Sequence, residues 1–158
     1  MAQFEGLKIQ RARLAVRLLA LSMATALAAC VESIEHNEGQ AARKAEEFVD
    51  VAFVRNDSER GYTLLAPATK RYVSLEQFKH VLSRLHPQGP PRNARAIEYE
   101  PMQGEKAVYI YLTGEHSGAH FYYRITMEGT AATDYRVLKF EGANEPFPPS
   151  PNKKPITK

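Results

Sequence analysis

Residues 108–128, VYIYLTGEHSGAHFYYRITME, alternate apolar and polar side chains on both sides of a central Ser117-Gly118 pair. Alternation with a period of two predicts strands with one buried face. If Ser117 and Gly118 form a two-residue hairpin turn, apolar residues oppose apolar residues. The predicted pairs are Leu112 with Tyr123, Ile110 with Ile125, and Val108 with Met127. A register shifted by one residue would turn one apolar set outward, so the pattern predicts this pairing.

The outward side of this hairpin is rich in aromatic residues. Tyr109, Tyr111, Tyr122 and Arg124 share it and are called the tyrosine face below, with Tyr111 opposite Arg124. Tyr and Arg are enriched in binding hot spots, and Arg above a Tyr ring adds cation–π attraction. Tyr also suits exposed strands for structural reasons alone. The tyrosine face is therefore a candidate binding surface, with ordinary strand composition as the alternative.

Two further strands are predicted beside the hairpin. A weaker one covers about Ala94 to Met102, with Ile97 and Tyr99 on one face. Another covers about Thr133 to Gly142, after the loop Gly129–Ala132. The register of this last strand is open, because two alternative residue pairs could face inward: Tyr135 with Val137, or Leu138 with Phe140.

The residues before the strands have helical periodicity. A stripe with three- and four-residue spacing predicts a helix from Ala41 to about Arg55. The stripe consists of Ala41, Ala45, Phe48, Val49, Ala52 and Phe53. Asn56-Asp57-Ser58 indicates a stop and a new N-cap, followed by a short helix over Glu59–Leu65 that Pro67 interrupts.

A third helix is predicted to begin at the capping box Ser74-Leu75-Glu76-Gln77. Pro87 and Gly89-Pro90-Pro91 end this segment. Its apolar face consists of Leu75, Phe78, Val81, Leu82 and Leu85.

Helices followed by an antiparallel meander predict an α+β fold, with helices on one face of a curved, cone-like sheet of about four strands. Over residues 41–142 this order resembles the nuclear transport factor two-like (cystatin-like) superfamily. The resemblance lies in the first helix with Ala45, Phe48, Val49 and Phe53, in Gly61–Leu65, and in Tyr135–Phe140. It is one of pattern without a diagnostic motif, and a different helix-on-sheet fold remains the alternative.

The start of the chain has the order of a secretory signal. Lys8, Arg11, Arg13 and Arg17, with Glu5 as the only acid, precede an apolar run over residues 18–29. A helix that crosses a bilayer needs roughly 20 apolar residues, and this run is shorter. It is therefore predicted to be removed.

Leu27-Ala28-Ala29-Cys30 resembles the lipobox of bacterial lipoproteins, and Cys30 is the only cysteine. The resemblance implies cleavage between Ala29 and Cys30, lipid on the Cys30 thiol, and, because Val31 is not Asp, an outer-membrane location facing the periplasm. The alternatives are an ordinary signal cleaved after Ala29 and a short hydrophobic helix with a buried cysteine. With one cysteine the chain forms no internal disulfide.

The predicted organisation is a signal peptide over residues 1–29, a tether over 30–40, an α+β domain over 41–143, and a disordered Pro/Lys-rich tail over 144–158. Cleavage before Cys30 removes four of 21 basic residues and one of 18 acidic residues, which leaves 17 of each. A neutral chain lacks the excess of Lys and Arg that attracts nucleic acid, so no nucleic-acid partner is expected.

Candidates for chemistry are few. The resembled superfamily includes isomerases and dehydratases that use an Asp or His inside the cone, but the predicted inward strand positions carry neither. Asp134 and His80 remain as weak catalytic candidates, with surface positions as the alternative. Glu115, His116 and His120 near the hairpin turn fall short of the three or four well-placed ligands of a zinc site. No catalytic residue, metal or cofactor is therefore assigned.

The sequence favours a lipid-anchored envelope module that binds or assembles without an evident catalytic site. Its partner would be an envelope protein or an apolar ligand, held on the tyrosine face or in a pocket between helices. The alternatives are a small pocket enzyme of the same superfamily, isomerase-like or hydrolase-like, and a subunit of an envelope secretion complex.

Overall fold

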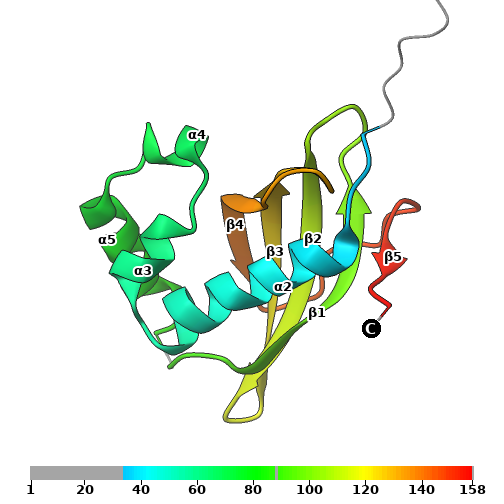
Figure 1. Cartoon of the computed structure of the whole chain (residues 1–158). Coiled ribbons are helices and arrows are strands. Elements are labelled where there is room, and N and C mark those ends of the chain that lie inside the picture. Colours follow the sequence, from blue (N-terminus) through cyan, green and yellow to red (C-terminus); the bar gives the residue numbers. More distant parts are fainter. Residues whose placement is uncertain (1–33, 88, 158) are drawn as a thin grey trace, which may run out of the picture. The chain divides into compact units, whose positions relative to one another are not determined.

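Helix α2 (Glu38–Val49) lies across one face of an antiparallel sheet in the computed structural model, which describes residues 34–87 and 89–157 (Figure 1). Within these residues the sheet has five strands in the order β4-β3-β2-β1-β5. The α+β class is confirmed, with one strand more than predicted. The strands are β1 (Arg92–Pro101), β2 (Ala107–His116), β3 (Ala119–Glu128), β4 (Arg136–Ala143) and β5 (Lys154–Pro155). The predicted signal peptide and Cys30 lie outside the described residues.

The β2–β3 hairpin has the predicted register. Leu112 pairs with Tyr123, Ile110 with Ile125 and Val108 with Met127. Ser117 and Gly118 form the turn with φ of 51° and 84°, the left-handed values that a two-residue hairpin turn with right-handed strand twist requires. The inward side chains of these pairs are buried against α2 and its continuation. The hairpin is thus the centre of the fold.

Strand β1 departs from the predicted alternation at a β-bulge. Its register shifts between Ala96, opposite Leu112, and Glu98, opposite Tyr111. The bulge leaves Ile97 37% exposed, while Ala96 and Tyr99 pack toward the core. The prediction that Ile97 and Tyr99 share a face was therefore wrong, because an extra residue in one strand reverses the alternation beyond it.

A second bulge resolves the open register of β4. Met127 pairs with Val137, but Thr126 pairs with Lys139 and Ile125 with Phe140. Leu138 is the extra residue. Tyr135 and Val137 are buried before the bulge, and Phe140 packs on the core after it. Neither alternative from the sequence was complete, since the inward set combines residues from both.

Helix α2 begins earlier than predicted and changes its hydrogen bonding before it ends. Asn37 caps it by accepting from the Gln40 amide. All six residues of the predicted apolar stripe are buried. From Asp50 to Val54 the chain is a π-helix, labelled η2. Residues 38–40 therefore belong to the domain, and the predicted tether over 30–40 was too long at this end.

The connection from η2 to the sheet contains three short helices: α3 (Ser58–Thr63), α4 (Pro67–Lys70) and α5 (Leu75–Leu85). Asp57 caps α3, and both bonds of the predicted capping box at Ser74 and Gln77 are present. Phe78 and Leu82 of α5 are buried, but Val81 is 45% exposed, contrary to the predicted face. Helix α4 was not predicted. These helices gather at one end of α2 (Figure 1).

The C-terminal residues are not the disordered tail that was predicted. Lys154 pairs with Tyr99 and Pro155 with Glu98 on the free edge of β1. The Ile156 amide donates to the Ile97 carbonyl, and Ile156 packs against the core. The prolines prevent a long strand, because each removes one backbone donor, but they do not prevent docking.

Candidate functional site

A hollow of about 470 Å³ lies where the end of α5 meets the ends of β3 and β4. It is open to solvent on one side. Its lining consists of Leu85, His86, Pro87, Ala119, His120, Phe121, Tyr123, Gly142, Ala143 and Asn144. Concave sites that combine apolar walls with a few polar groups are the usual form of small-ligand sites. This lining contains apolar and polar surface in nearly equal shares, and the hollow is the candidate site.

His86 and Tyr123 form the polar centre of the hollow. His86 Nε2 lies 2.6 Å from the Tyr123 hydroxyl oxygen. Burial lowers the pKa of the His86 imidazole below its ordinary value and raises the pKa of the Tyr123 hydroxyl above its own. Both shifts have the same cause, because removal from water disfavours the charged form of each group. The pair is therefore uncharged near neutral pH.

Aromatic rings hold His86 in place. Its ring centroid lies 5.3 Å from that of Phe53, 5.6 Å from Phe121 and 5.7 Å from Tyr123. Phe53 reaches this position from η2, whose wider turn changes the angular spacing of the residues after Asp50. His86 itself is the C-cap of α5 and precedes Pro87. A helix end, a π-turn and one strand thus converge on one imidazole.

Gly142 leaves the hollow open on its β4 side. A Cβ atom at this position would lie 3.3 Å from Leu85 Cδ1 and 3.8 Å from Tyr123 Cδ1. Any side chain longer than that of Ala would extend from β4 toward these two lining residues. Gly142 is therefore the position where a substitution fills the hollow.

The lining includes no carboxylate and no Lys or Arg side chain. A second hollow of about 220 Å³ is lined by residues of η2 and α5 together with Asn56, His86 and Pro90, and it also has no carboxylate and no Lys or Arg side chain in its lining. His86 lines both hollows. The site can therefore hold an apolar group and exchange hydrogen bonds with it, but it provides no fixed charge for an ionic ligand.

The tyrosine face is largely covered, contrary to its prediction as an exposed binding surface. Arg124 pairs with Tyr111 as predicted, but Tyr111 is 5% exposed. Phe147 lies against the Tyr111 ring at 5.8 Å between centroids, and Lys153 Nζ lies 4.0 Å from the same ring. Tyr109 and Tyr122 are partly buried. Phe147 and Lys153 thus occupy the surface that was predicted to be free.

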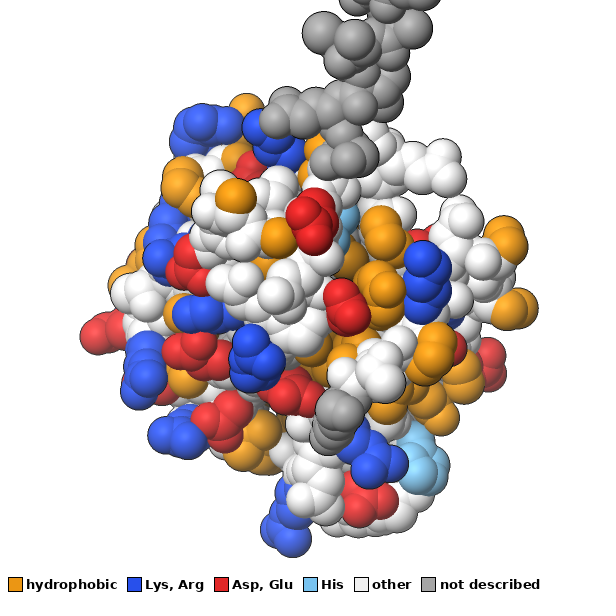
Figure 2. All heavy atoms as spheres, turned by 45° about the vertical axis from the view of Figure 1, so that its right-hand side comes forward, with side chains coloured by type: hydrophobic (Ala, Val, Ile, Leu, Met, Phe, Trp, Pro, Cys, Tyr) orange, Lys and Arg blue, Asp and Glu red, His pale blue; other side chains and the backbone are white. Residues whose placement is uncertain are grey.

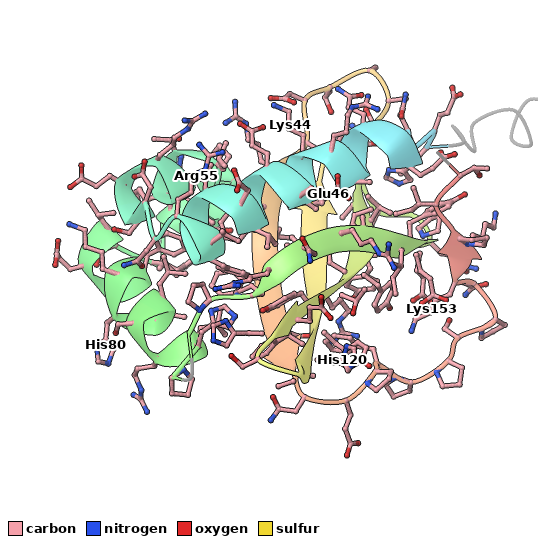
Figure 3. All side chains as sticks on the ribbon, turned by 90° about the horizontal axis from the view of Figure 1, so that it is seen from below. Lys44, Glu46, Arg55, His80, His120 and Lys153 are labelled. Carbon is pink, nitrogen blue, oxygen red and sulfur yellow. The ribbon has the colours of Figure 1, made fainter. Side chains whose placement is uncertain are left out.

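The other residues that the sequence suggested for chemistry are Asp134, His80 and the Glu115–His116–His120 group, and none of them forms a catalytic or metal site in the described residues. Asp134 is half exposed and forms ion pairs with Lys44 and Arg136. His80 is exposed and points away from the sheet on the outer side of α5 (Figure 3). In the described residues no group of three or more His, Cys, Asp or Glu side chains is placed to hold a metal ion, although Glu115 pairs with His120 across the hairpin.

His86 was not among the sequence-based candidates. One signal was present, because a titratable residue follows directly on the apolar stripe of the third predicted helix and precedes a helix-ending proline. Periodicity alone cannot tell whether such a residue turns inward, since the helix ends at that point. Its partner Tyr123 was correctly placed on the inward face.

Comparison of the chain with protein-family models, with curated proteins and with solved structures finds no match. No helix among the described residues is long and apolar enough to span a bilayer. A functional proposal therefore rests on the sequence pattern and on the site.

Proposed function

We propose that this protein is a lipid-anchored binding module of the cell envelope, of nuclear transport factor two-like type, which holds an uncharged, mostly apolar small ligand in the hollow beside His86. The anchor is a lipid on Cys30 after cleavage of residues 1–29, and the location is the outer membrane facing the periplasm. The α+β domain is the part that carries the ligand.

One observation carries the ligand assignment: the hollow places an uncharged His86–Tyr123 pair among apolar and aromatic side chains, with no charged group in its lining. An anionic or cationic ligand would lose its hydration there without gaining an ionic partner. An apolar ligand gains from leaving water, and its orientation is set by the few polar groups. This favours a neutral ligand with one or two polar atoms.

The neutral fluorophore N-phenyl-1-naphthylamine tests the hollow, because its emission rises when it leaves water. Native protein is expected to give a saturable rise. Gly142→Leu is expected to weaken binding at least tenfold, since the new side chain would extend from β4 into the space beside Leu85 and Tyr123. Fluorescence titration gives the dissociation constant of each protein, and its melting temperature shows whether the variant is folded.

Ala132→Leu is the matched control, since it adds a leucine to an exposed loop that does not line the hollow. It should bind the fluorophore as the native protein does. Equal binding by a folded Gly142→Leu variant would show that the fluorophore sits elsewhere and would remove the hollow as the ligand site.

The anchor is tested separately by mass spectrometry of protein isolated from its native membrane. The expected result is an N-terminal Cys30 that carries diacylglyceryl and acyl chains. A chain that still begins at Met1 would contradict both the cleavage and the envelope location. Cys30→Ala should abolish the lipid and release the protein from the membrane fraction.

A small pocket enzyme is the second candidate, and the short His86–Tyr123 contact favours it, because a neutral imidazole can act as a general base. Hydrolysis of p-nitrophenyl acetate is a simple probe of such an activity. Activity that is lost in His86→Gln, while fluorophore binding persists, would favour the enzyme. The same slow rate in both proteins would favour the binding module.

A further inference from the structure

Residues 147–156 are called the C-terminal segment. Phe147 and Lys153 lie on the sheet face opposite α2, whereas Lys154 and Pro155 form the edge strand β5 and Ile156 packs against the core. The strand register places four polar or aromatic side chains in a row across β1 to β4. Glu98 pairs with Tyr111, Tyr111 with Arg124, and Arg124 with Glu141. Figure 3 shows Lys153 reaching from the C-terminal segment toward these strands. The row offers an aromatic ring with acidic and basic neighbours, which is a different surface from the apolar inner face.

Two side chains of the C-terminal segment enclose the Tyr111 ring. Phe147 contacts it, and the Arg124 guanidinium lies 5.1 Å from the centroid of the Phe147 ring. Lys153 Nζ lies 4.0 Å from the Tyr111 centroid and 3.9 Å from Glu98 Oε2, and this lysine side chain is only 8% exposed. A desolvated ammonium over an aromatic ring beside a carboxylate is a strong recognition contact.

Glu100 links the segment to the sheet from the other end. Its carboxylate accepts hydrogen bonds from the Tyr111 and Ser150 hydroxyls. Burial raises the pKa of the Glu100 carboxyl, but these two hydroxyls, Lys153 and Arg124 outweigh burial and hold it below its ordinary value. The carboxylate is therefore ionised when the segment is docked.

The backbone contributes little to this docking. Only Lys154 and Pro155 pair with β1. One further backbone hydrogen bond runs from the Ile156 amide to the Ile97 carbonyl. Four of the residues in the C-terminal segment are prolines, at positions 148, 149, 151 and 155. Proline has no amide donor and restricts the chain before it binds. The segment turns at residues 150–153, where the Lys153 amide donates to the Ser150 carbonyl and Lys153 Nζ donates to the Phe147 and Pro148 carbonyls. The turn brings Phe147 and Lys153 to the same Tyr111 ring, and side-chain anchors on a restricted chain are a means by which proline-rich peptides are recognised on aromatic surfaces.

Figure 2, which brings the side of β1 and β5 forward, shows hydrophobic side chains gathered there with Lys or Arg and Asp or Glu side chains among them. Such a mixed surface differs from a core interface, because charged side chains stand among its apolar contacts.

We propose that the tyrosine face, with Glu98 and Glu100, is a recognition surface for a proline-rich peptide that turns back on itself and carries an aromatic residue and a lysine six positions later. The C-terminal segment is its tethered occupant, and a partner peptide of the same chemistry displaces it. This inference concerns the face opposite the hollow and is independent of the ligand proposed above.

The probe is a fluorescein-labelled peptide with the sequence of residues 144–158, and the receptor is the full chain with Phe147→Ala and Lys153→Ala, which weaken the tethered copy. Saturable binding by fluorescence anisotropy is expected for this variant. Native protein should bind at least tenfold more weakly, because its own segment competes at a high effective concentration. A peptide with both anchors replaced by alanine should not bind.

Absence of peptide binding to a folded double variant would overturn the proposal, as would equal binding of the intact and the alanine peptides. Should the double variant fail to fold, amide exchange on the native chain decides. The Ile156 amide is expected to exchange at least tenfold faster than amides of the β2–β3 ladder, since the segment detaches without unfolding. Equal protection would show that the segment is a permanent part of the fold.

Discussion

The two faces of the β2–β3 hairpin are both covered, but by different kinds of contact. Val108, Ile110, Ile125 and Met127 meet helix α2 and the aromatic cluster behind it, and they are fully or almost fully buried. On the opposite face Tyr111 is covered by a lysine, a phenylalanine and a network of carboxylates. The same two strands thus carry one dry face and one polar-aromatic face.

The difference separates stability from recognition. Removing apolar contacts from the inner face leaves a cavity that nothing refills. Removing contacts from the outer face exposes groups that water can solvate, so the loss is smaller. We therefore expect substitutions on the inner face to act mainly on global unfolding, and those on the outer face to act mainly on the C-terminal segment.

The largest effect is expected for Ile110→Ala, because Ile110 is fully buried between α2 and the neighbouring strands. The free energy of unfolding should fall by about 2–5 kcal/mol. Urea unfolding followed by circular dichroism measures it, and the transition midpoint should fall with little change in slope.

Ile97→Ala is the matched control, since Ile97 occupies the β1 bulge and is 37% exposed. Its effect should stay within about 0.5 kcal/mol. If the free energy of unfolding falls by similar amounts in Ile110→Ala and Ile97→Ala, the inner face does not contribute more to stability than the rest of the sheet.

An intermediate effect is expected for Tyr111→Phe, which keeps the ring but removes the hydroxyl that donates to Glu100. A hydrogen bond to a charged acceptor contributes about 1.5 kcal/mol at the low end of its range. The variant should also speed amide exchange at Ile156, because Glu100 holds both Tyr111 and Ser150.

Tyr109→Phe serves as the comparison, since within the described residues the Tyr109 hydroxyl takes part in no side-chain hydrogen bond. It should change neither the unfolding midpoint nor the Ile156 exchange rate. If Tyr111→Phe lowers stability but leaves Ile156 exchange unchanged, the hydroxyl supports the sheet and does not hold the segment.

The smallest expected effect is a pH dependence of stability that arises from His86, the titratable group at the end of the inner face. Burial lowers its pKa in the folded protein, so between that value and the ordinary value of about 6.5 the unfolded chain binds a proton that the folded chain does not. Stability from this residue is complete above the ordinary value and declines as the pH falls below it. The native melting temperature should therefore drop by a few degrees between pH 7.5 and pH 5.5.

His86→Gln provides the test of this assignment, because glutamine can still bond to Tyr123 but does not titrate. Between pH 7.5 and pH 5.5, the melting temperature of the variant should fall by less than that of the native protein. An equal drop in both would assign the pH dependence to other groups.

Much of the sheet and two helix starts could be predicted from local pattern. The hairpin register followed from alternation across Ser117-Gly118, and the start of α5 followed from the capping box at Ser74 and Gln77. The bulges at Ile97 and Leu138 could not be predicted in this way. A bulge depends on which residue the neighbouring strand leaves unpaired, so it is decided by pairing between segments.

The candidate site was predictable only in part. Tyr123 was placed inward from its strand, but His86 follows the last helical residue, where periodicity no longer specifies a direction. The π-turn that brings Phe53 to the same imidazole was also invisible, because its spacing in sequence resembles that of an ordinary α-helix.

By itself, the sequence determined the α+β class, the hairpin and its dry face, because these depend on periodicity and turn chemistry within short stretches. Only the tertiary structure decided that a proline-rich end docks on the tyrosine face and that a histidine after α5 meets a tyrosine of β3. Both depend on contacts between residues far apart in the chain, whose energies arise only when the remaining elements have already fixed the distance between them.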